Sequence, residues 1–186
     1  MNEVLKTISE RYSCRGYTGI PVPDDQLLAI ADSALCSPSA MGLAPWHIVI
    51  VKDTNLIAEM DRYGLEYLHR NDTAVYERFM TRGGDLFYGA PRMIVVAARP
   101  DDSGQISEID CGIVAQNIAL AATSLGVANV ICGIAAVCFT GDGKQYFEDK
   151  LSFPAGYQFG ISVLLGYEKL PGKAHTPDLS KITIVE

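Results

Sequence analysis

Residues 110–126, DCGIVAQNIALAATSLG, predict a long helix that begins at Asp110 and is stopped by Gly126. Apolar or small residues occupy nearly all of its circumference, and a helix that is apolar all round is buried inside a protein. A glycine directly after a helix readily adopts the left-handed conformation that ends it. The two amides Gln116 and Asn117 need hydrogen-bond partners in such surroundings, either backbone groups, which is the commoner case, or a bound ligand.

Apolar segments on both sides of this helix predict the strands of a sheet. Residues 92–98, RMIVVAA, are continuously apolar, as in a strand that is buried on both faces. Further strands are expected at 46–52, at 128–136 (ANVICGIAA) and at 157–167 (YQFGISVLLGY). Gly133 lies inside the third of these strands, and a glycine there indicates close approach of another backbone or of a ligand.

The remaining segments predict shorter helices and an extended tail. Helices are expected at 2–11, at 25–36 with Asp24 as cap, after Thr54 as cap to about 68, within 69–90 and at 141–151. The face of the second helix that is expected to point inward carries Leu27, Leu28, Ala31 and Leu35. The tail, residues 168–186, is expected to be extended and to end in a strand-like segment. Residues 1–186 therefore predict one α+β domain, with helices around a mixed, mainly antiparallel sheet.

Composition excludes several classes of function. The net charge of −7 over 186 residues argues against broad nucleic-acid binding, which needs a concentrated positive surface. No apolar run approaches the roughly 18 residues of a membrane span, and the N-terminal segment lacks the apolar core of a signal peptide. The five cysteines form no C-x-x-C pair, and the three histidines show no ligand spacing, so we expect reduced thiols, no metal site and a cytoplasmic location.

Residues 10–15, ERYSCR, are the first candidate binding element. Arg11, Ser13 and Arg15 alternate, so in extended geometry their side chains point the same way. Guanidinium groups and a hydroxyl match the oxygens of a phosphate. The alternative is a solvated basic turn that pairs with surface carboxylates.

Residues 37–46, SPSAMGLAPW, are the second candidate, because they are too rigid and too apolar for a simple connector. Pro38 and Pro45 fix the backbone, and a fixed backbone can line the edge of a flat ring. The alternative is a wide turn whose Met41 and Trp46 enter the core. The sequence contains no Ser-His-Asp arrangement, Walker loop or G-x-G-x-x-G that opens a helix.

Four segments, in order, resemble the nitroreductase family of FMN-dependent oxidoreductases. They are ERYSCRGYTGIPVPDDQLLAIADSALCSPSAMGLAPWHIVIVKD, LFYGAPRMIVVAA, DCGIVAQNIALAATSLGV and FGISVLLGYEK. The first is similar to the family's R-x-S-x-R turn, S-P-S segment and Q-P-W, and the second to its G-A-P before a central strand. The resemblance covers most of the chain. It implies the family's fold and an intertwined homodimer with FMN at the interface.

The resemblance also implies the residues that contact FMN. The R-x-S-x-R turn and a basic pair in the tail hold the phosphate and ribityl chain in the family; here they are Arg11, Tyr12, Ser13, Arg15, Lys173 and His175. The S-P-S segment lies along the isoalloxazine; here it is Pro38, Ser39, Ala40, Met41 and Gly42. The strand after the central helix passes flavin N5, with one side chain of that helix nearby; here these residues are Ile131, Cys132, Gly133, Ile134 and Gln116. An aromatic group is expected over the flavin: Tyr63, Tyr67, Tyr76, Phe79, Phe87 and Tyr88.

This sequence departs from the family's pattern at three positions. Gly42 and Ala44 stand where the family commonly has Asn and Gln, and His175 stands where it has Arg. Backbone groups would therefore replace an amide side chain at the flavin. The resemblance implies electron transfer from NAD(P)H through flavin N5 to a small acceptor, such as a nitroaromatic or a quinone, with no protein acid or base identified. The alternatives are a flavoprotein with another reaction (dehydrogenation, dehalogenation or flavin breakdown) and a non-catalytic flavin-binding protein.

Overall fold

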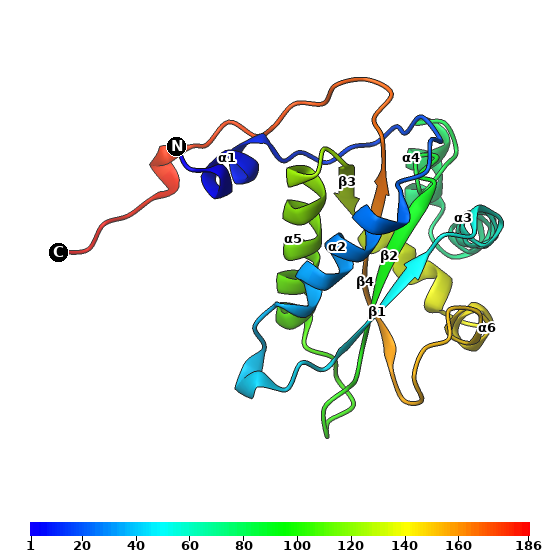
Figure 1. The fold of residues 1–186 in the computed structure, drawn as a ribbon. Helices are drawn as coiled ribbons and strands as arrows, with labels where there is room; N and C mark the ends of the chain where they lie inside the picture. The colour runs from blue at the N-terminus through cyan, green and yellow to red at the C-terminus, as the bar shows by residue number, and fades with distance from the viewer.

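Four antiparallel strands form the centre of the computed structural model, which describes residues 1–186 (Figure 1). Their order across the sheet is β1-β2-β4-β3. The strands are β1 (Trp46–Val51), β2 (Arg92–Ala98), β3 (Ala128–Ile131) and β4 (Gln158–Gly166). An isolated parallel bridge joins Ser13 to Asn129 beside β3. The expected α+β class with a mainly antiparallel sheet is confirmed.

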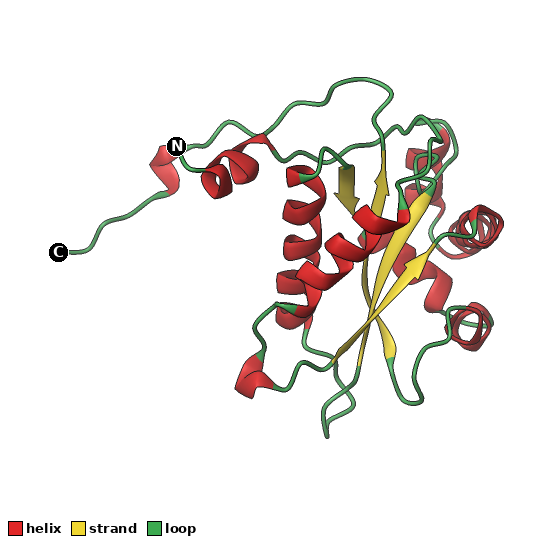
Figure 2. Ribbon diagram, viewed as in Figure 1, coloured by secondary structure: helices red, strands yellow, loops and turns green.

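Helices cover both faces of this sheet (Figure 2). They are α1 (Glu3–Glu10), α2 (Asp24–Leu35), α3 (Thr54–Asn71), α4 (Thr73–Met80), α5 (Glu108–Ser124) and α6 (Gly143–Lys150), with short 3-10 helices η1 (Ala40–Gly42), η2 (Gly133–Phe139) and η3 (Leu179–Lys181). Helices α2 and α5 lie on one face, and α3, α4 and α6 lie on the other (Figure 1). None of the helices combines the length and apolar character that a membrane crossing requires.

Two apolar cores result from this layering. The core on the α2–α5 face includes Ile30, Val114 and Ile118 against Ile94 and Val163 of the sheet. The core on the other face is built from α3, η2 and α6; its members include Met60, Leu86, Phe87, Ala135, Cys138, Phe147 and Leu164. All five cysteines are free thiols, and all except Cys36 are buried.

The third predicted strand is half wrong, because β3 ends at Ile131 and η2 begins at Gly133. The ladder stops there because the Cys132 carbonyl accepts from the Ser162 hydroxyl, at 2.8 Å, rather than from the Ser162 N–H. The tail also differs from the prediction, since its last residues form η3 and irregular chain rather than a strand.

Two predicted caps are displaced by one residue. Pro23, not Asp24, precedes α2, and Asp24 instead forms an ion pair with Lys52 at 2.7 Å. Asp53, not Thr54, caps α3 by accepting from the backbone N–H groups of two following residues. The terminator of α5 is confirmed, because Gly126 follows the C-cap with φ +71°.

Several apolar faces lie open in the single chain. Leu28 and Leu35 of α2 are exposed, contrary to prediction, while Ile30 and Ala34 are buried beside Leu27. Helix α1 has no buried residue at all. Helix α5 is not buried all round either. In Figure 1 the tail runs past α1 and away from the body of the molecule, so the two termini lie on the same side.

Two carboxylates meet where α3 packs against the loop before β2. Asp61 accepts from the Leu86 N–H at 2.7 Å, and Asp85 accepts from the Phe87 N–H at 2.8 Å. Burial, followed by the negative charge of Asp85, raises the pKa of Asp61 to about 6. The two carboxylates therefore hold a buried loop in place, and their contribution to the free energy of unfolding depends on pH.

We expect Asp61→Asn to remove this dependence. A raised carboxyl pKa contributes stability that is complete below about pH 4 and is lost as the pH rises through about 6. At pH 7.5 the asparagine variant should be more stable than wild type by about 1 kcal/mol, since solvent screening at this half-buried site limits the effect. At pH 4 the two should be equal. Urea unfolding at both pH values measures the difference, with Asp32→Asn on the exposed side of α2 as control.

Candidate functional site

The segment 11–18 crosses one end of the sheet in an extended conformation. The Cys14 N–H donates to the Asn129 carbonyl at 2.9 Å, which places the segment on the outer edge of β3. The Thr18 N–H donates to the Tyr167 carbonyl at 2.8 Å, which joins the same segment to the chain after β4. These two hydrogen bonds hold the segment in the extended geometry that the expected alternation of its side chains requires. Cys14 is buried in the core, while Arg11 and Ser13 are half-buried and Arg15 is exposed.

The two arginines of this turn form no ion pair within the chain. The buried Nε of Arg11 also has no hydrogen-bond partner. Burial, followed by the positive charge of Arg15, lowers the pKa of Arg11. Two neighbouring unpaired guanidinium groups favour an anion, because it would remove their repulsion and supply acceptors. The alternative of a turn neutralised by surface carboxylates predicts ion pairs that these two arginines do not form in the chain.

A cavity of about 310 Å³ lies beside Arg11. Its wall comes from the end of α1, the connection from α5 to β3 and the chain after β4: Glu10, Arg11, Tyr12, Thr123, Gly126, Val127, Ala128, Asn129, Tyr167 and Glu168. The tail crosses Tyr12 so closely that a Cβ at Gly172 would overlap the aromatic ring. The exposed Lys173 and His175 follow directly, so the tail brings them to this end of the sheet.

Residues 37–45 form a loop with an unusual backbone. Met41, Gly42 and Ala44 all have left-handed φ values, of 52°, 66° and 44°. The Ser39 hydroxyl accepts from the Ala44 N–H at 2.8 Å and closes the loop on itself. Gly42 suits its position, because glycine adopts positive φ without strain and asparagine does so more easily than other residues. Gly42 in place of the family's common asparagine thus lacks the amide side chain but still allows the left-handed backbone conformation at this position.

Side-chain exposure separates the two interpretations of this loop. Trp46 is buried, as the core-turn interpretation expects, but Met41 is 89% exposed and fills no core space. Asn117 of α5 donates to the Ser37 hydroxyl at 2.9 Å, so its partner is this loop rather than the backbone. The neighbouring amide of Gln116 is exposed and free to meet a ligand.

The junction between β3 and η2 presents the residues expected near flavin N5. Ile131 and Ile134 are half-buried, Cys132 is buried, and Gly133 is exposed. The buried Ser162 of β4 fastens this junction, because its hydroxyl donates to the Cys132 carbonyl at 2.8 Å. Sequence reasoning missed Ser162. The available signal was a lone serine inside the apolar strand FGISVLLG.

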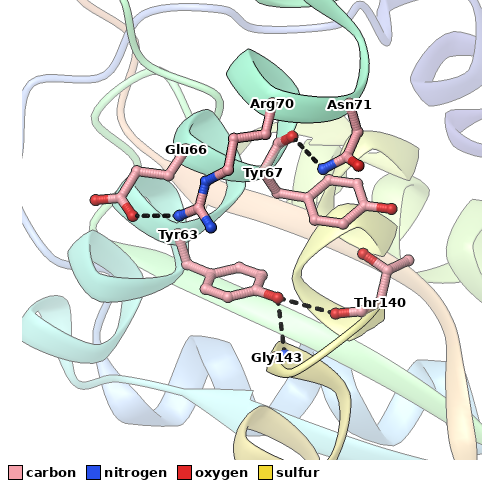
Figure 3. Close-up of polar contacts among 7 residues, drawn as sticks. All are labelled: Tyr63, Glu66, Tyr67, Arg70, Asn71, Thr140 and Gly143. Carbon is pink, nitrogen blue, oxygen red and sulfur yellow. Dashed lines mark hydrogen bonds and ion pairs between the residues drawn. The ribbon is translucent and has the colours of Figure 1, made fainter.

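Tyr63 fastens the other end of η2, as Figure 3 shows. Its hydroxyl donates to the Thr140 carbonyl at 2.9 Å and accepts from the Gly143 N–H at 2.8 Å. A Cβ at Gly143 would lie 2.5 Å from the Tyr63 ring, so glycine is required at this contact.

The aromatic group expected over the flavin is packed differently. Phe87 is fully buried in the core, which contradicts a position over the pocket. Tyr63, Tyr67, Tyr76, Phe79 and Tyr88 are partly buried, and all except Tyr67 are packed against the same core. The hydrophobic packing of α3 and α4 accounts for these residues without a ligand.

One chain does not bring all the predicted site residues together. The turn 11–18 and the start of the tail lie at one end of α5, whereas η1 and its loop lie at the opposite end (Figure 1). The junction at Gly133 and the turn share the outer edge of β3. The predicted site residues therefore form two separate groups within one chain. A ligand that contacts both kinds of residue would have to receive loop 37–45 from outside this chain.

Comparisons with known proteins agree with this architecture. A model of the nitroreductase family matches residues 8–167. A nitroreductase with bound FMN from Desulfitobacterium hafniense is 48% identical, with a TM-score of 0.95 and coverage of 100% of both chains. A second FMN-bound nitroreductase, from Bacteroides fragilis, is 30% identical, with a TM-score of 0.88 and the same coverage. A relative from Archaeoglobus fulgidus, whose name joins NADH dehydrogenase and NAD(P)H nitroreductase, is 31% identical over 91% of this chain and 87% of its own. The chain therefore belongs to the nitroreductase family of oxidoreductases.

Proposed function

We propose that the protein is an FMN-dependent oxidoreductase that transfers electrons from NAD(P)H to a small organic acceptor, such as a nitroaromatic or a quinone. The observation that carries the proposal is the turn with Arg11 and Arg15, two neighbouring guanidinium groups that form no ion pair in the chain. A phosphate fits this turn, because it accepts from both arginines. The two FMN-bound nitroreductases and the name of the Archaeoglobus fulgidus relative support the choice of cofactor and electron donor.

The residues divide into three groups according to their part in binding. Phosphate and ribityl contacts come from Arg11, Tyr12, Ser13, Arg15, Lys173 and His175. Loop 37–45 contributes its backbone and the side chains of residues 38–42 to a wall for a flat ring. The β3–η2 junction, Ile131–Ile134, and Gln116 lie along the ring. The positive φ values of the loop suit this work, since they turn backbone groups outward where Gly42 has no side chain to offer.

The chain supplies placement and electrostatics to the reaction. When bound, FMN would supply the redox chemistry, taking up electrons from NAD(P)H and passing them to the acceptor. The arginines anchor one end of the cofactor by charge-assisted hydrogen bonds. Gly133 is exposed and its N–H has no acceptor in the chain, so this N–H is available to N5. The exposed Met41 and the rigid loop exclude water from one face of the ring.

We further propose a homodimer in which each subunit lends loop 37–45 to the site of the other. The separation of the two groups of site residues along α5 supports this arrangement (Figure 1). So do the open apolar faces of α1 and α2 and the unpaired edge of β1. The tail also carries exposed apolar side chains, namely Leu179, Ile182, Ile184 and Val185. Free thiols at all five cysteines suit a cytoplasmic location.

Removal of residues 179–186 tests the dimer. We expect the shortened chain to lose apolar contact area with its partner and to shift from dimer to monomer, because an extended tail gains stability only by covering another surface. Light scattering after size-exclusion chromatography measures the mass. A full-length chain that is monomeric at micromolar concentration would contradict the arrangement.

Anaerobic reduction tests the function. The purified protein mixed with FMN should turn yellow, and addition of NADH or NADPH should bleach the bound flavin. Reoxidation by a nitroaromatic or a quinone identifies the acceptor class. A protein that remains colourless after FMN addition would refute the proposal. A yellow protein that NAD(P)H does not bleach would favour a different flavin reaction or a non-catalytic flavin carrier.

A further inference from the structure

The peptide between Cys132 and Gly133 leaves the sheet in an orientation that one side chain holds. The Cys132 N–H still makes the ladder bond to the Ser162 carbonyl, at 2.8 Å. The return bond of a regular antiparallel pair, from the Ser162 N–H to the Cys132 carbonyl, is absent. The Ser162 hydroxyl donates to that carbonyl instead, at 2.8 Å. Correspondingly, ψ of Cys132 is 86°, against about 135° in an antiparallel strand.

This orientation decides where the Gly133 N–H points. All peptide bonds in the chain are trans, so the N–H of Gly133 is antiparallel to the carbonyl of Cys132. The carbonyl faces Ser162 on β4. The N–H therefore faces away from β4, toward the outer edge of β3, which is an edge strand. That is the edge on which the Asn129 carbonyl holds the arginine turn through Cys14.

Exposure differs between the two ends of this contact. Gly133 is exposed, whereas Ser162 is completely buried. The Gly133 N–H has no acceptor in the chain, so it is a donor that a ligand can use.

We propose that Ser162 is a positioning residue for the flavin: by holding the Cys132 carbonyl it directs the Gly133 N–H to N5 of bound FMN. The inference rests on the proposed function and adds to it the device that aims the donor. Hydrogen bonds in a chain strengthen one another, so the bond from Ser162 also polarises the peptide and makes its N–H a better donor. Ser162 itself does not touch the cofactor.

Binding of a flavin analogue distinguishes a Ser162 that orients the Gly133 N–H from a Ser162 that only supports the fold. In 5-deaza-FMN a C–H group replaces N5 and cannot accept a hydrogen bond, while the phosphate and ring system remain. Wild type should bind FMN about three- to tenfold more tightly than 5-deaza-FMN, the range that one net hydrogen bond supplies. In Ser162→Ala the ratio of the two dissociation constants should fall to within about twofold of unity. Equilibrium dialysis measures both constants, so the readout is binding rather than turnover.

Two further variants guard the interpretation. Tyr63→Phe removes the hydrogen bonds at the far end of η2 and leaves the Cys132–Gly133 peptide untouched, so its ratio should equal that of wild type. Ser162→Cys keeps the volume and a weak hydrogen-bond donor, so its ratio should lie between those of wild type and Ser162→Ala. It takes the place of Ser162→Ala in the test if the alanine variant does not fold. An unchanged ratio in the folded Ser162 variants, or equal binding of both flavins by wild type, overturns the inference alone. A wild-type protein that binds neither flavin overturns the proposed function and, with it, this inference.

Discussion

Arg11→Gln should raise the dissociation constant for FMN by about 10- to 100-fold while leaving that for riboflavin within about twofold. A hydrogen bond to a charged group contributes about 1.5–3 kcal/mol, and glutamine keeps a polar side chain without the charge. Riboflavin lacks the phosphate, so it does not use the guanidinium. Arg11 and Arg15 repel each other in the chain alone, and the pKa of Arg11 is lowered partly for that reason. The double variant with Arg15→Gln should therefore lose at least 100-fold.

Fluorescence titration of both flavins provides the measurement, since binding changes the emission of the flavin. Arg78→Gln is the matched control, because it removes one exposed positive charge that lies on α4 rather than in the turn. An equal loss of FMN and riboflavin affinity in Arg11→Gln would mean that the arginine supports the fold rather than the phosphate. No loss at all would place the phosphate elsewhere.

The elements with strong local signals were predictable from the sequence. The strand at 92–98 is continuously apolar, and it is buried along nearly its whole length as β2. The end of α5 at Gly126 follows from the left-handed conformation that glycine permits. The order of four motifs predicted the family, which the family match confirms. The alternation of the arginine turn was predictable because it survives in any extended segment, and its part in binding stays a prediction.

Long-range contacts explain what could not be predicted. The end of β3 depends on the Ser162 hydroxyl, which lies 30 residues further along the chain than Cys132. No periodicity reports such a contact. The exposure of Leu28 and Gln116 was also missed, because an apolar pattern marks a surface to be covered and does not say whether the same chain covers it. Both errors fall on surfaces that the proposed dimer would use.

Gly160→Ala should produce the second large effect, a loss of stability, because it disturbs the packing of α5 against the sheet. A Cβ at Gly160 would lie 2.6 Å from the Cys111 Sγ and 3.0 Å from the Val96 carbonyl oxygen. The helix must move off β4 to admit it, and overpacking of this kind costs about 1–3 kcal/mol. We expect a loss at the upper end of that range, because one of the two obstacles is backbone. Urea unfolding of the cofactor-free protein measures it.

A second substitution decides whether the cause is this contact. Cys111→Ala removes the nearer obstacle and, alone, should cost about 1 kcal/mol of buried contact. In the double variant the new methyl group occupies space that the thiol has left, so the two losses should not add. Neighbouring residues that share a contact show coupling of 0.5–3 kcal/mol, and we expect at least 1 kcal/mol here. Additive losses would mean that the helix does not rest on Gly160. Coupling would mean that the absence of one side chain on β4 sets the depth at which the central helix, with Gln116 and Asn117 on it, lies against the sheet.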